Sequence, residues 1–240
     1  MSTELSITAA SAQFTANGTT VGGFVARPAD GQPAPAILLI HEWWGLTDHI
    51  REIAERYARQ GFVAAAVDLY DGTLTRDAQQ AAKLMESLDP AKALDYLATA
   101  VAHLRAAPDV TAVGVTGFCM GGVYTILTAC HNQVEAAVAY YGIPDDLSVL
   151  SGLSCPLLFF GGERDQWITV EKIQRLEDTL QQAAKEVEVK IYPGADHAFF
   201  NNTRPEVYSP SDAQDAWQRT IDFFNHHLRQ GQPSATPATG

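Results

Sequence analysis

Cysteine and charge are both scarce in this chain of 240 residues, and each shortage excludes a class of protein. The three cysteines, Cys119, Cys130 and Cys155, are odd in number and lack the spacing of a disulfide scaffold or a zinc site. Charged residues make up 18% and apolar residues 46%, which excludes disorder as the main state. A chain of this length buries enough surface to fold without a disulfide or a metal. Because neither a disulfide scaffold nor a zinc site is expected, one of the three thiols can be a reactive group.

Positive charge and long apolar runs are also scarce. Sixteen basic residues stand against 28 acidic ones, and a net charge of −12 disfavours nucleic acid and anionic membranes as partners. No apolar stretch approaches the ~20 residues that cross a bilayer. Residues 1–4 lack the basic and apolar regions of a signal peptide. We therefore expect a cytoplasmic protein, a monomer or small homo-oligomer, that binds neither nucleic acid nor membranes.

Short apolar runs alternate with amphipathic stretches along the chain, and Asn17-Gly18 predicts the turn of an N-terminal hairpin. The alternation predicts an α/β fold, with a mostly parallel central sheet flanked by helices on both faces. We interpret residues 1–230 as a single domain and the low-complexity residues 231–240 as a disordered tail. The predicted strands are 36–40, 62–67, 112–116, 134–140, 157–160 and 187–191.

The most specific motif is Gly117-Phe118-Cys119-Met120-Gly121-Gly122, which lies between a predicted strand and an apolar helix. It has the spacing of the G-x-S-x-G nucleophile elbow, with Cys119 in place of serine. Such a turn strains the nucleophile's backbone and leaves no room for a Cβ at the flanking positions. The positive end of the helix is expected to stabilise a thiolate at Cys119. Cys130 and Cys155 lack this context and are expected to be buried apolar residues.

An elbow nucleophile needs a base, and the base needs an acid that orients it. On this fold the order along the chain is nucleophile, acid, histidine. Acidic residues follow one predicted strand and His197 follows another, so both reach the carboxyl edge of the sheet, where α/β sites form. We predict His197 as the base and Asp165 as the acid. Glu163 comes early in its turn and Asp196 adjoins His197, so both rank below Asp165.

The segment His41-Glu42-Trp43-Trp44-Gly45-Leu46 follows a predicted strand at the position that supplies one oxyanion-hole amide on this fold. Trp43 is the expected donor from this loop. Met120, the residue after the nucleophile, supplies the second amide. Each aimed amide is worth about 3–4 kcal/mol to the transition state in other hydrolases.

Glu42 ends an apolar strand beside this loop, and is therefore expected near the thiol. In a structural interpretation its carboxylate caps a helix or pairs with a cation such as Arg51. In a functional interpretation it takes or returns the proton of Cys119. The residues alone leave these two interpretations about even.

Together these motifs resemble the dienelactone hydrolase family, the cysteine members of the α/β-hydrolase superfamily that open enol-lactones. The resemblance implies a carboxylic ester hydrolase that acts on a small-molecule lactone or ester, without cofactor or metal. It implies a triad of Cys119, His197 and Asp165. It also implies that Glu42 contacts the resting thiol and helps to generate the thiolate when substrate arrives. The residues that carry the resemblance, within about 20–228, are His41–Leu46, Asp68–Tyr70, Gly117–Gly122, Tyr140–Gly142 and His197–Phe199.

Two departures from the family bear on the substrate. Its members hold a substrate carboxylate with two arginines, one of which lies a turn beyond the histidine, where this chain has Asn201. Arg204 follows three residues later. The other lies on the helix corresponding to residues 75–87, where this chain has Ala78, with Arg76 close by. Either Arg76 and Arg204 do the same work from shifted positions, or the substrate is not this carboxylated lactone.

Aromatic residues near the motifs predict an aromatic-walled substrate pocket, although core packing is expected to account for some of them. Two alternative functions stay open. One is a general cysteine esterase or thioesterase with another acyl substrate, and the other is a redox sensor that uses Cys119. An ordered acid and histidine favour hydrolysis, because a sensor needs neither. The aromatic candidates for substrate binding are Trp44, Tyr141, Trp167 and Phe199.

Overall fold

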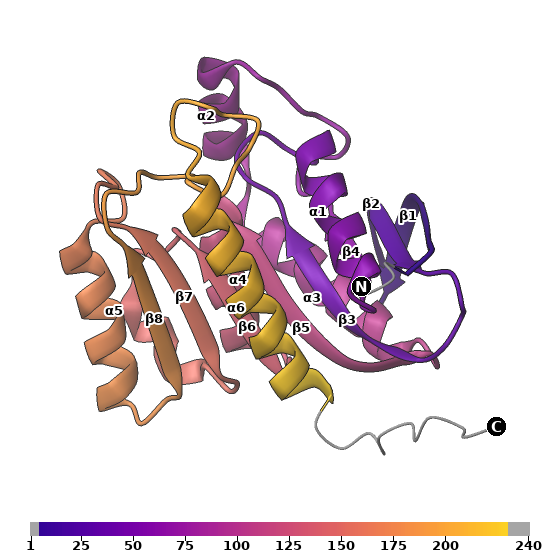
Figure 1. Ribbon diagram of the computed structural model, residues 1–240. Coiled ribbons are helices and arrows are strands. Elements are labelled where there is room, and N and C mark those ends of the chain that lie inside the picture. Colours follow the sequence, from indigo (N-terminus) through magenta and orange to yellow (C-terminus); the bar gives the residue numbers. More distant parts are fainter. Residues whose placement is uncertain (1–4, 230–240) are drawn as a thin grey trace.

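The computed structural model describes residues 5–229, which build an eight-stranded sheet (Figure 1). The tail expected at 231–240 lies outside these residues. The strands are β1 (Ile7–Ala16), β2 (Thr19–Pro28), β3 (Ala34–Ile40), β4 (Val63–Val67), β5 (Val110–Phe118), β6 (Ala136–Tyr140), β7 (Leu157–Gly162) and β8 (Val187–Tyr192). Their spatial order is β1-β2-β4-β3-β5-β6-β7-β8, and β3 to β8 run parallel.

Helices cover both faces of the sheet (Figure 1). α1 (Asp48–Arg59) and α6 (Pro210–Arg229) pack on one face, and α3 (Pro90–Ala106), α4 (Met120–His131) and α5 (Val170–Gln182) pack on the other. α2 (Ala78–Ser87) lies beyond the sheet, and Ala81 is its one fully buried residue. A 3-10 turn spans Leu147–Gly152. Among residues 5–229, no helix is long and apolar enough to cross a membrane. The arrangement confirms the predicted α/β class.

The N-terminal hairpin forms at the predicted turn. Asn17 and Gly18 both have positive φ, 50° and 84°, as a two-residue type I′ turn requires. β1 pairs with β2 along its whole length, and β2 pairs antiparallel with β4. The hairpin therefore extends the parallel sheet and does not form a separate layer.

Loops after four strands carry the predicted site residues to one edge of the sheet. Glu42 follows β3, and Cys119 follows the neighbouring strand β5 directly. Asp165 and His197 follow β7 and β8, which also pair with each other. Because parallel strands end at the same edge, the four side chains converge there although they are far apart in the sequence.

Candidate active site

Cys119 stands alone between a strand and a helix, with β5 ending one residue before it and α4 beginning one residue after it. Its backbone has φ 56° and ψ −116°, and such a conformation costs about 1–3 kcal/mol in a residue with a Cβ. A Cβ at Gly121 would lie 2.7 Å from the carbonyl oxygen of His41, and one at Gly117 would overlap the carbonyl of Gly121. The sharp turn therefore requires both glycines, as the motif predicts.

Asp165 and His197 form a hydrogen bond of 2.6 Å between Oδ2 and Nδ1, and the two residues are only 3% and 9% exposed. The second carboxylate oxygen, Oδ1, accepts the amides of Trp167 and Ile168 at 2.8 and 2.9 Å. Burial alone would raise the pKa of Asp165, but the bond from His197 and the two amides hold it below its usual value. The ionised acid fixes the His197 proton on Nδ1, which leaves Nε2 to accept a proton.

Further contacts hold the imidazole in place. The ring of His197 packs against Tyr141 and Trp167, each with a centroid distance of 4.9 Å. Glu163, the competing acid, accepts the amide of Gly194 at 2.7 Å through Oε2. It therefore ties the turn after β7 to the turn after β8, and of these two acids Asp165 is the one that bonds to the histidine.

The thiol of Cys119 is not the stabilised thiolate that its place before a helix predicts. Burial, followed in size by the charge of Glu42, raises the pKa of Cys119 to about 12. A hydrogen bond from the Met120 amide lowers this pKa, but by less than burial raises it. The expectation is therefore wrong, because desolvation outweighs the helix terminus. The resting residue is a neutral thiol that needs a base when it attacks.

Glu42 is a buried carboxyl group whose charge acts on the thiol. It is 2% exposed, and burial raises its pKa to about 7. The Asn201 side chain donates to Oε2 at 2.7 Å, and the charge of Arg204 also favours the ionised form. Arg51, the partner in the structural interpretation, lies instead over the ring of Phe24 at 5.7 Å. A carboxyl group with a pKa near 7 can exchange a proton with a thiol at neutral pH.

Cys119 and His197 border one cavity of about 290 Å³, here called the thiol cavity. Its walls are mostly apolar, and Trp167 is 63% exposed there. The two expected oxyanion donors, Trp43 and Met120, border it too. The Met120 amide is at the first position of α4, where a helix leaves N–H groups without an intrahelical partner. The described lining residues are Trp43, Met85, Cys119, Met120, Val123, Tyr141, Gly142, Trp167, Ile168, His197 and Arg204.

Tyr141 combines a strained backbone with a hydroxyl group that has no partner. Its φ is 39°, and its hydroxyl oxygen is buried without a hydrogen bond within the described part of the chain. Burial, followed by the charges of Glu42 and Cys119, raises the pKa of Tyr141 well above its ordinary value, so the phenol keeps its proton. Leaving a buried hydroxyl unpaired costs about 1–3 kcal/mol. Tyr141 itself lines the thiol cavity.

A second cavity of about 440 Å³ borders the loop after β3 and is here called the Glu42 cavity. Arg204 lines both cavities, whereas Arg76 and Trp44 line this one alone. Phe199 lines neither and is fully buried against Tyr141, with ring centroids 5.5 Å apart. The described lining residues of the Glu42 cavity are Glu42, Trp44, Thr47, Asp48, His49, Thr75, Arg76, Asn201, Thr203, Arg204 and Glu206.

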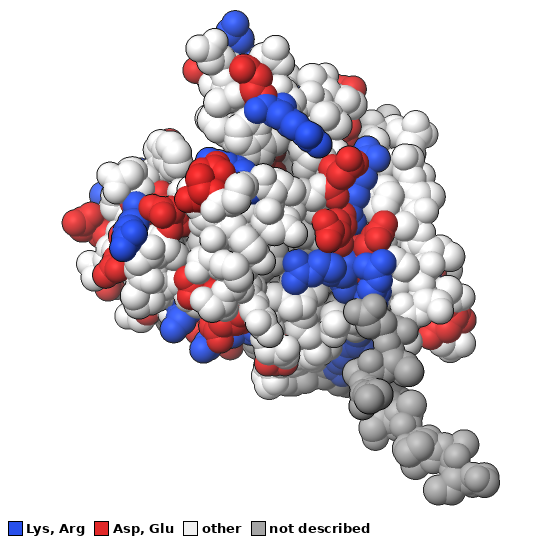
Figure 2. All heavy atoms as spheres, turned by 45° about the horizontal axis from the view of Figure 1, so that its top comes forward, with Lys and Arg blue, Asp and Glu red and all other residues white. Residues whose placement is uncertain are grey.

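Charge at this edge of the sheet is mixed. Figure 2 turns the edge toward the viewer and shows acidic and basic side chains interspersed among wide neutral areas. Within residues 5–229, no group of three or more His, Cys, Asp or Glu side chains is placed to hold a metal ion. The charged groups that act on the thiol are Glu42, Asp165 and Arg204.

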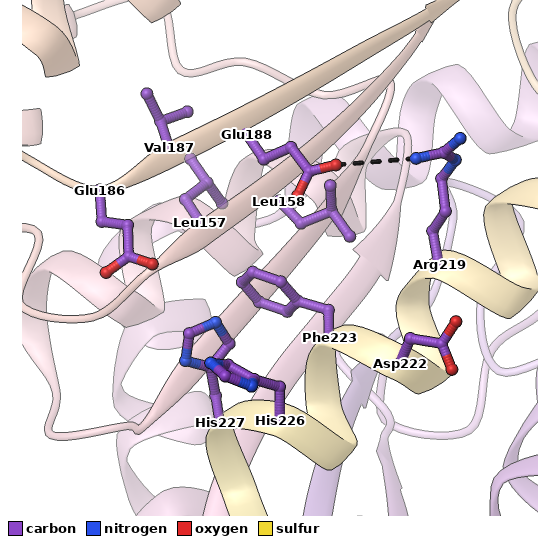
Figure 3. A pocket seen from close by; sticks show the side chains of 10 residues that line it. All are labelled: Leu157, Leu158, Glu186, Val187, Glu188, Arg219, Asp222, Phe223, His226 and His227. Atoms are coloured by element: carbon purple, nitrogen blue, oxygen red, sulfur yellow. Dashed lines mark ion pairs between the residues drawn. The ribbon is translucent and has the colours of Figure 1, made fainter.

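A further cavity, of about 430 Å³, lies at the opposite edge, where β7 and β8 begin and α6 ends (Figure 3). Arg219 and Glu188 form an ion pair of 3.8 Å in its wall, and His226 and His227 project from α6. None of its described lining residues is a cysteine, serine or threonine that could act as a nucleophile. This cavity is therefore not the reaction site.

Two residues at the site make contacts that the sequence motifs do not assign. Asn201 departs from the family pattern in the sequence, and in the structure it contacts Glu42. His41 donates from Nδ1 to the carbonyl oxygen of Glu42 at 2.6 Å and accepts the Leu69 amide on Nε2 at 3.1 Å. The placement of His41 directly after an apolar strand was the available signal. The contact of Asn201 spans 159 positions and has no local signal.

Comparison with known proteins points to one family. The Dienelactone hydrolase family matches residues 21–228. A "Putative carboxymethylenebutenolidase" of Aquifex aeolicus is 32% identical over 228 residues, which cover 90% of this chain and 98% of that protein. A "Probable 2-oxo-3-(5-oxofuran-2-ylidene)propanoate lactonase" of Bradyrhizobium sp is 31% identical over 228 residues, which cover 88% of this chain and 92% of that protein.

Similarity extends to solved structures. The crystal structure of a "Putative Dienelactone Hydrolase" from Klebsiella pneumoniae aligns with a TM-score of 0.82 and 30% sequence identity. The alignment covers 91% of this chain and 98% of that one. The family match, the relatives and the shared architecture agree with one another. The chain is a carboxylic ester hydrolase with the α/β-hydrolase fold, and it belongs to the dienelactone hydrolase family.

Proposed function

We propose that the chain is a cysteine-dependent hydrolase that opens an enol-lactone or an activated ester through Cys119, His197 and Asp165. The observation that carries the proposal is the 2.6 Å bond from Asp165 to His197, which lines the same cavity as the strained thiol. A nucleophile, a base and an orienting acid are the parts that acyl transfer needs. The relatives' names, a carboxymethylenebutenolidase and a lactonase, point to the same reaction class.

The first half-reaction forms a thioester. Cys119 attacks the carbonyl carbon, and as the Sγ–C bond forms the thiol proton passes to the Glu42 carboxylate. The negative oxygen is held by the amides of Trp43 and Met120. Collapse breaks the C–O bond, and the leaving oxygen departs as an enolate or alkoxide and takes up the proton from Glu42, which restores the carboxylate. Because an enolate is a good leaving group, activated lactones and esters suit this nucleophile.

The second half-reaction releases the acid. His197, oriented by Asp165, removes a proton from water as the water oxygen attacks the thioester carbonyl. The C–S bond breaks, and the sulfur regains a proton from the imidazolium. One ester or lactone bond and one water are consumed, which leaves a carboxylic acid and an alcohol or enol.

A neutral substrate fits the thiol cavity better than a carboxylated one. Among the described residues that line it, Arg204 is the one with a permanent positive charge, and its Nε lies 2.9 Å from Oε1 of Glu206. Arg76 borders the neighbouring cavity. A substrate carboxylate therefore meets a single cation that already has an anionic partner. In this proposal the apolar faces of Trp43 and Trp167 receive the substrate, and Tyr141 offers it the hydroxyl.

The test compares hydrolysis of a carboxylated dienelactone and an uncharged activated aryl ester by the wild type and Cys119→Ala. The expected result is turnover of the uncharged ester, at least as fast as of the dienelactone, that falls about 10³-fold or more without the thiol. Mass spectrometry of the quenched wild type should show an acyl adduct on Cys119. Full activity in Cys119→Ala would overturn the mechanism. A strong preference for the dienelactone would overturn the neutral substrate alone.

The geometry disfavours a redox sensor. Sensor cysteines have lowered pKa values, whereas burial raises the pKa of Cys119 to about 12. A general esterase or thioesterase uses the same residues with a different acyl group. Turnover of a thioester substrate faster than the aryl ester would favour that alternative.

A further inference from the structure

Asn201 is a buried amide with both of its polar atoms engaged. Its Nδ2 donates to Oε2 of Glu42 at 2.7 Å. Its Oδ1 accepts from Thr203 twice, from the amide nitrogen at 2.9 Å and from Oγ1 at 2.7 Å. Because both Thr203 groups donate, the oxygen of Asn201 must face them and its NH₂ group must face the carboxylate. The side chain therefore has one orientation, and Thr203 determines it.

The turn that carries Asn201 is the one that carries His197. The amide of Asn201 donates to the carbonyl of Ala198 at 2.9 Å, and Ala198 has a φ of 63°. Phe199 and Phe200, which separate the two polar residues, are buried in the aromatic core. A single anchored turn therefore presents a base toward the thiol cavity and a donor toward Glu42.

Glu42 needs such a donor because it loses most of its hydration. A carboxylate removed from water is costly unless hydrogen bonds replace the water. The charge of Arg204 acts on Glu42, but the hydrogen bond from Asn201 is the larger of the two effects that favour its ionised form. A donor that is correctly oriented without rearrangement stabilises that form at the least cost.

We propose that Asn201, oriented by Thr203, is the positioning residue that holds the Glu42 carboxylate ready to take the proton of Cys119. The proposal rests on the role of Glu42 in the proposed function, and extends it to two residues that contact neither substrate nor thiol. The Asn201 hydrogen bond keeps the acceptor ionised before attack. When Cys119 bonds to an electrophilic carbon, its proton moves to Glu42 and the leaving group departs with the electron pair.

The position of Thr203 makes the proposal testable. Asn201 and Thr203 line the Glu42 cavity and are absent from the described lining of the thiol cavity. Thr203 is exposed, so its substitution leaves the core unchanged. Thr203→Val removes the hydroxyl donor and keeps the amide donor, whereas Thr203→Ser keeps both. Thr47→Val is the matched control, because Thr47 lines the same cavity and its side chain makes no capping bond to α1.

The readout is the pH dependence of Cys119 alkylation by iodoacetamide. The alkylation rate of the Cys119→Ala variant, which reports the other cysteines, is subtracted. In this reaction the Sγ–C bond forms, iodide leaves and the thiol proton passes to Glu42. Alkylation needs no turnover, so it tests the positioning role even if the proposed hydrolysis is wrong. If Glu42→Gln leaves the wild-type profile unchanged, the role of Glu42 itself fails, and this proposal fails with it.

The expected result is an acid midpoint near pH 7 in the wild type that moves alkaline when the donor is weakened. Asn201→Ala should move the midpoint up by about one unit, which slows alkylation about tenfold at pH 6. Thr203→Val should move it by about half a unit. Thr203→Ser and Thr47→Val should match the wild type. In steady-state hydrolysis, kcat should fall in Thr203→Val while KM changes less than twofold.

Two results would overturn the proposal. The first is an unchanged midpoint in both Asn201→Ala and Thr203→Val. If Asn201 had only a structural role, these variants would change stability but not the pH dependence of alkylation. The second is an equal shift in Thr203→Ser and Thr203→Val, because the hydroxyl would then have no part in orienting Asn201. If Asn201→Ala does not fold, the comparison of Thr203→Val with Thr203→Ser tests the proposal by itself.

Discussion

His41 donates its Nδ1 proton to the main-chain carbonyl of Glu42 at 2.6 Å, at the base of the loop that carries Trp43. Its other nitrogen accepts the Leu69 amide at 3.1 Å, so both ring nitrogens are used. Burial lowers the pKa of His41, against the smaller effect of the Glu42 carbonyl, and the ring therefore stays neutral. The imidazole thus links the loop after β3 to the loop after β4.

His41→Phe should show the value of this link. The ring volume is kept, but a buried carbonyl and a buried amide lose their partners, at about 1–3 kcal/mol for each group. We expect a loss of about 2–4 kcal/mol in the free energy of unfolding, measured by urea denaturation, and a lower kcat as the Trp43 amide loses its place. His131→Phe, at an exposed site, should change stability by less than 0.5 kcal/mol. Equal losses in the two variants would contradict this account.

Asp165→Asn should inactivate the base without unfolding the protein. Oδ1 of Asp165 accepts two amides, so the Asn oxygen must take its place and the NH₂ group must face His197. Nδ1 can then only accept, which puts the ring proton on Nε2, where it blocks general-base catalysis. We expect kcat for an activated ester to fall about 10³–10⁴-fold. Glu163→Gln, which keeps an acceptor for Gly194, is the control and should retain activity within a few fold.

Glu42→Gln should change how stability depends on pH. The pKa of Glu42 is about 7 in the folded protein against an ordinary 4.5, so between these values the folded state binds more protons than the unfolded one. Wild-type stability should therefore fall as the pH rises from about 4.5 to 7, and level off above. At pH 8 the variant should be more stable than the wild type by roughly 2–4 kcal/mol, with little difference at pH 4.5. Urea denaturation at both pH values measures this. The same stability difference between variant and wild type at pH 4.5 and at pH 8 would refute it.

Tyr141→Phe should raise stability and lower activity together. Removing a buried hydroxyl that has no partner within residues 5–229 should stabilise the fold by about 1 kcal/mol. Tyr141 lines the thiol cavity, so kcat should fall if its hydroxyl donates to the substrate. Thermal melting and ester hydrolysis together provide the test. A less stable variant would mean that the hydroxyl has a structural partner, and unchanged kcat would restrict its effect to stability.

The strands and the elbow could be predicted because their signals are local. Apolar runs mark strands that are buried on both faces, and the glycines around Cys119 mark a turn that a Cβ would block. The state of the thiol could not be predicted in this way. Its helix terminus is visible in the sequence, but the burial and the Glu42 charge that outweigh it arise only when β3 and β5 lie side by side.

The positions of the arginines show the same limit. Arg76 and Arg204 are equally plausible as substrate ligands in the sequence, yet only Arg204 lines the thiol cavity. Phe199 follows the predicted base closely, but it points into the core against Tyr141. Sequence position places a residue at the correct edge of the sheet. The direction of its side chain depends on turns whose geometry is fixed by distant packing.

The weak anchoring of α2 has a consequence for the evolution of this enzyme. The helix buries only Ala81 fully, yet it places Met85 in the wall of the thiol cavity. The nucleophile, base and acid stand on loops that follow core strands, so mutations in α2 leave them in place. New acyl groups can therefore be accommodated by changing a helix that contributes little to folding stability. The part of the substrate range that Met85 controls is therefore encoded apart from the strands that hold the fold together.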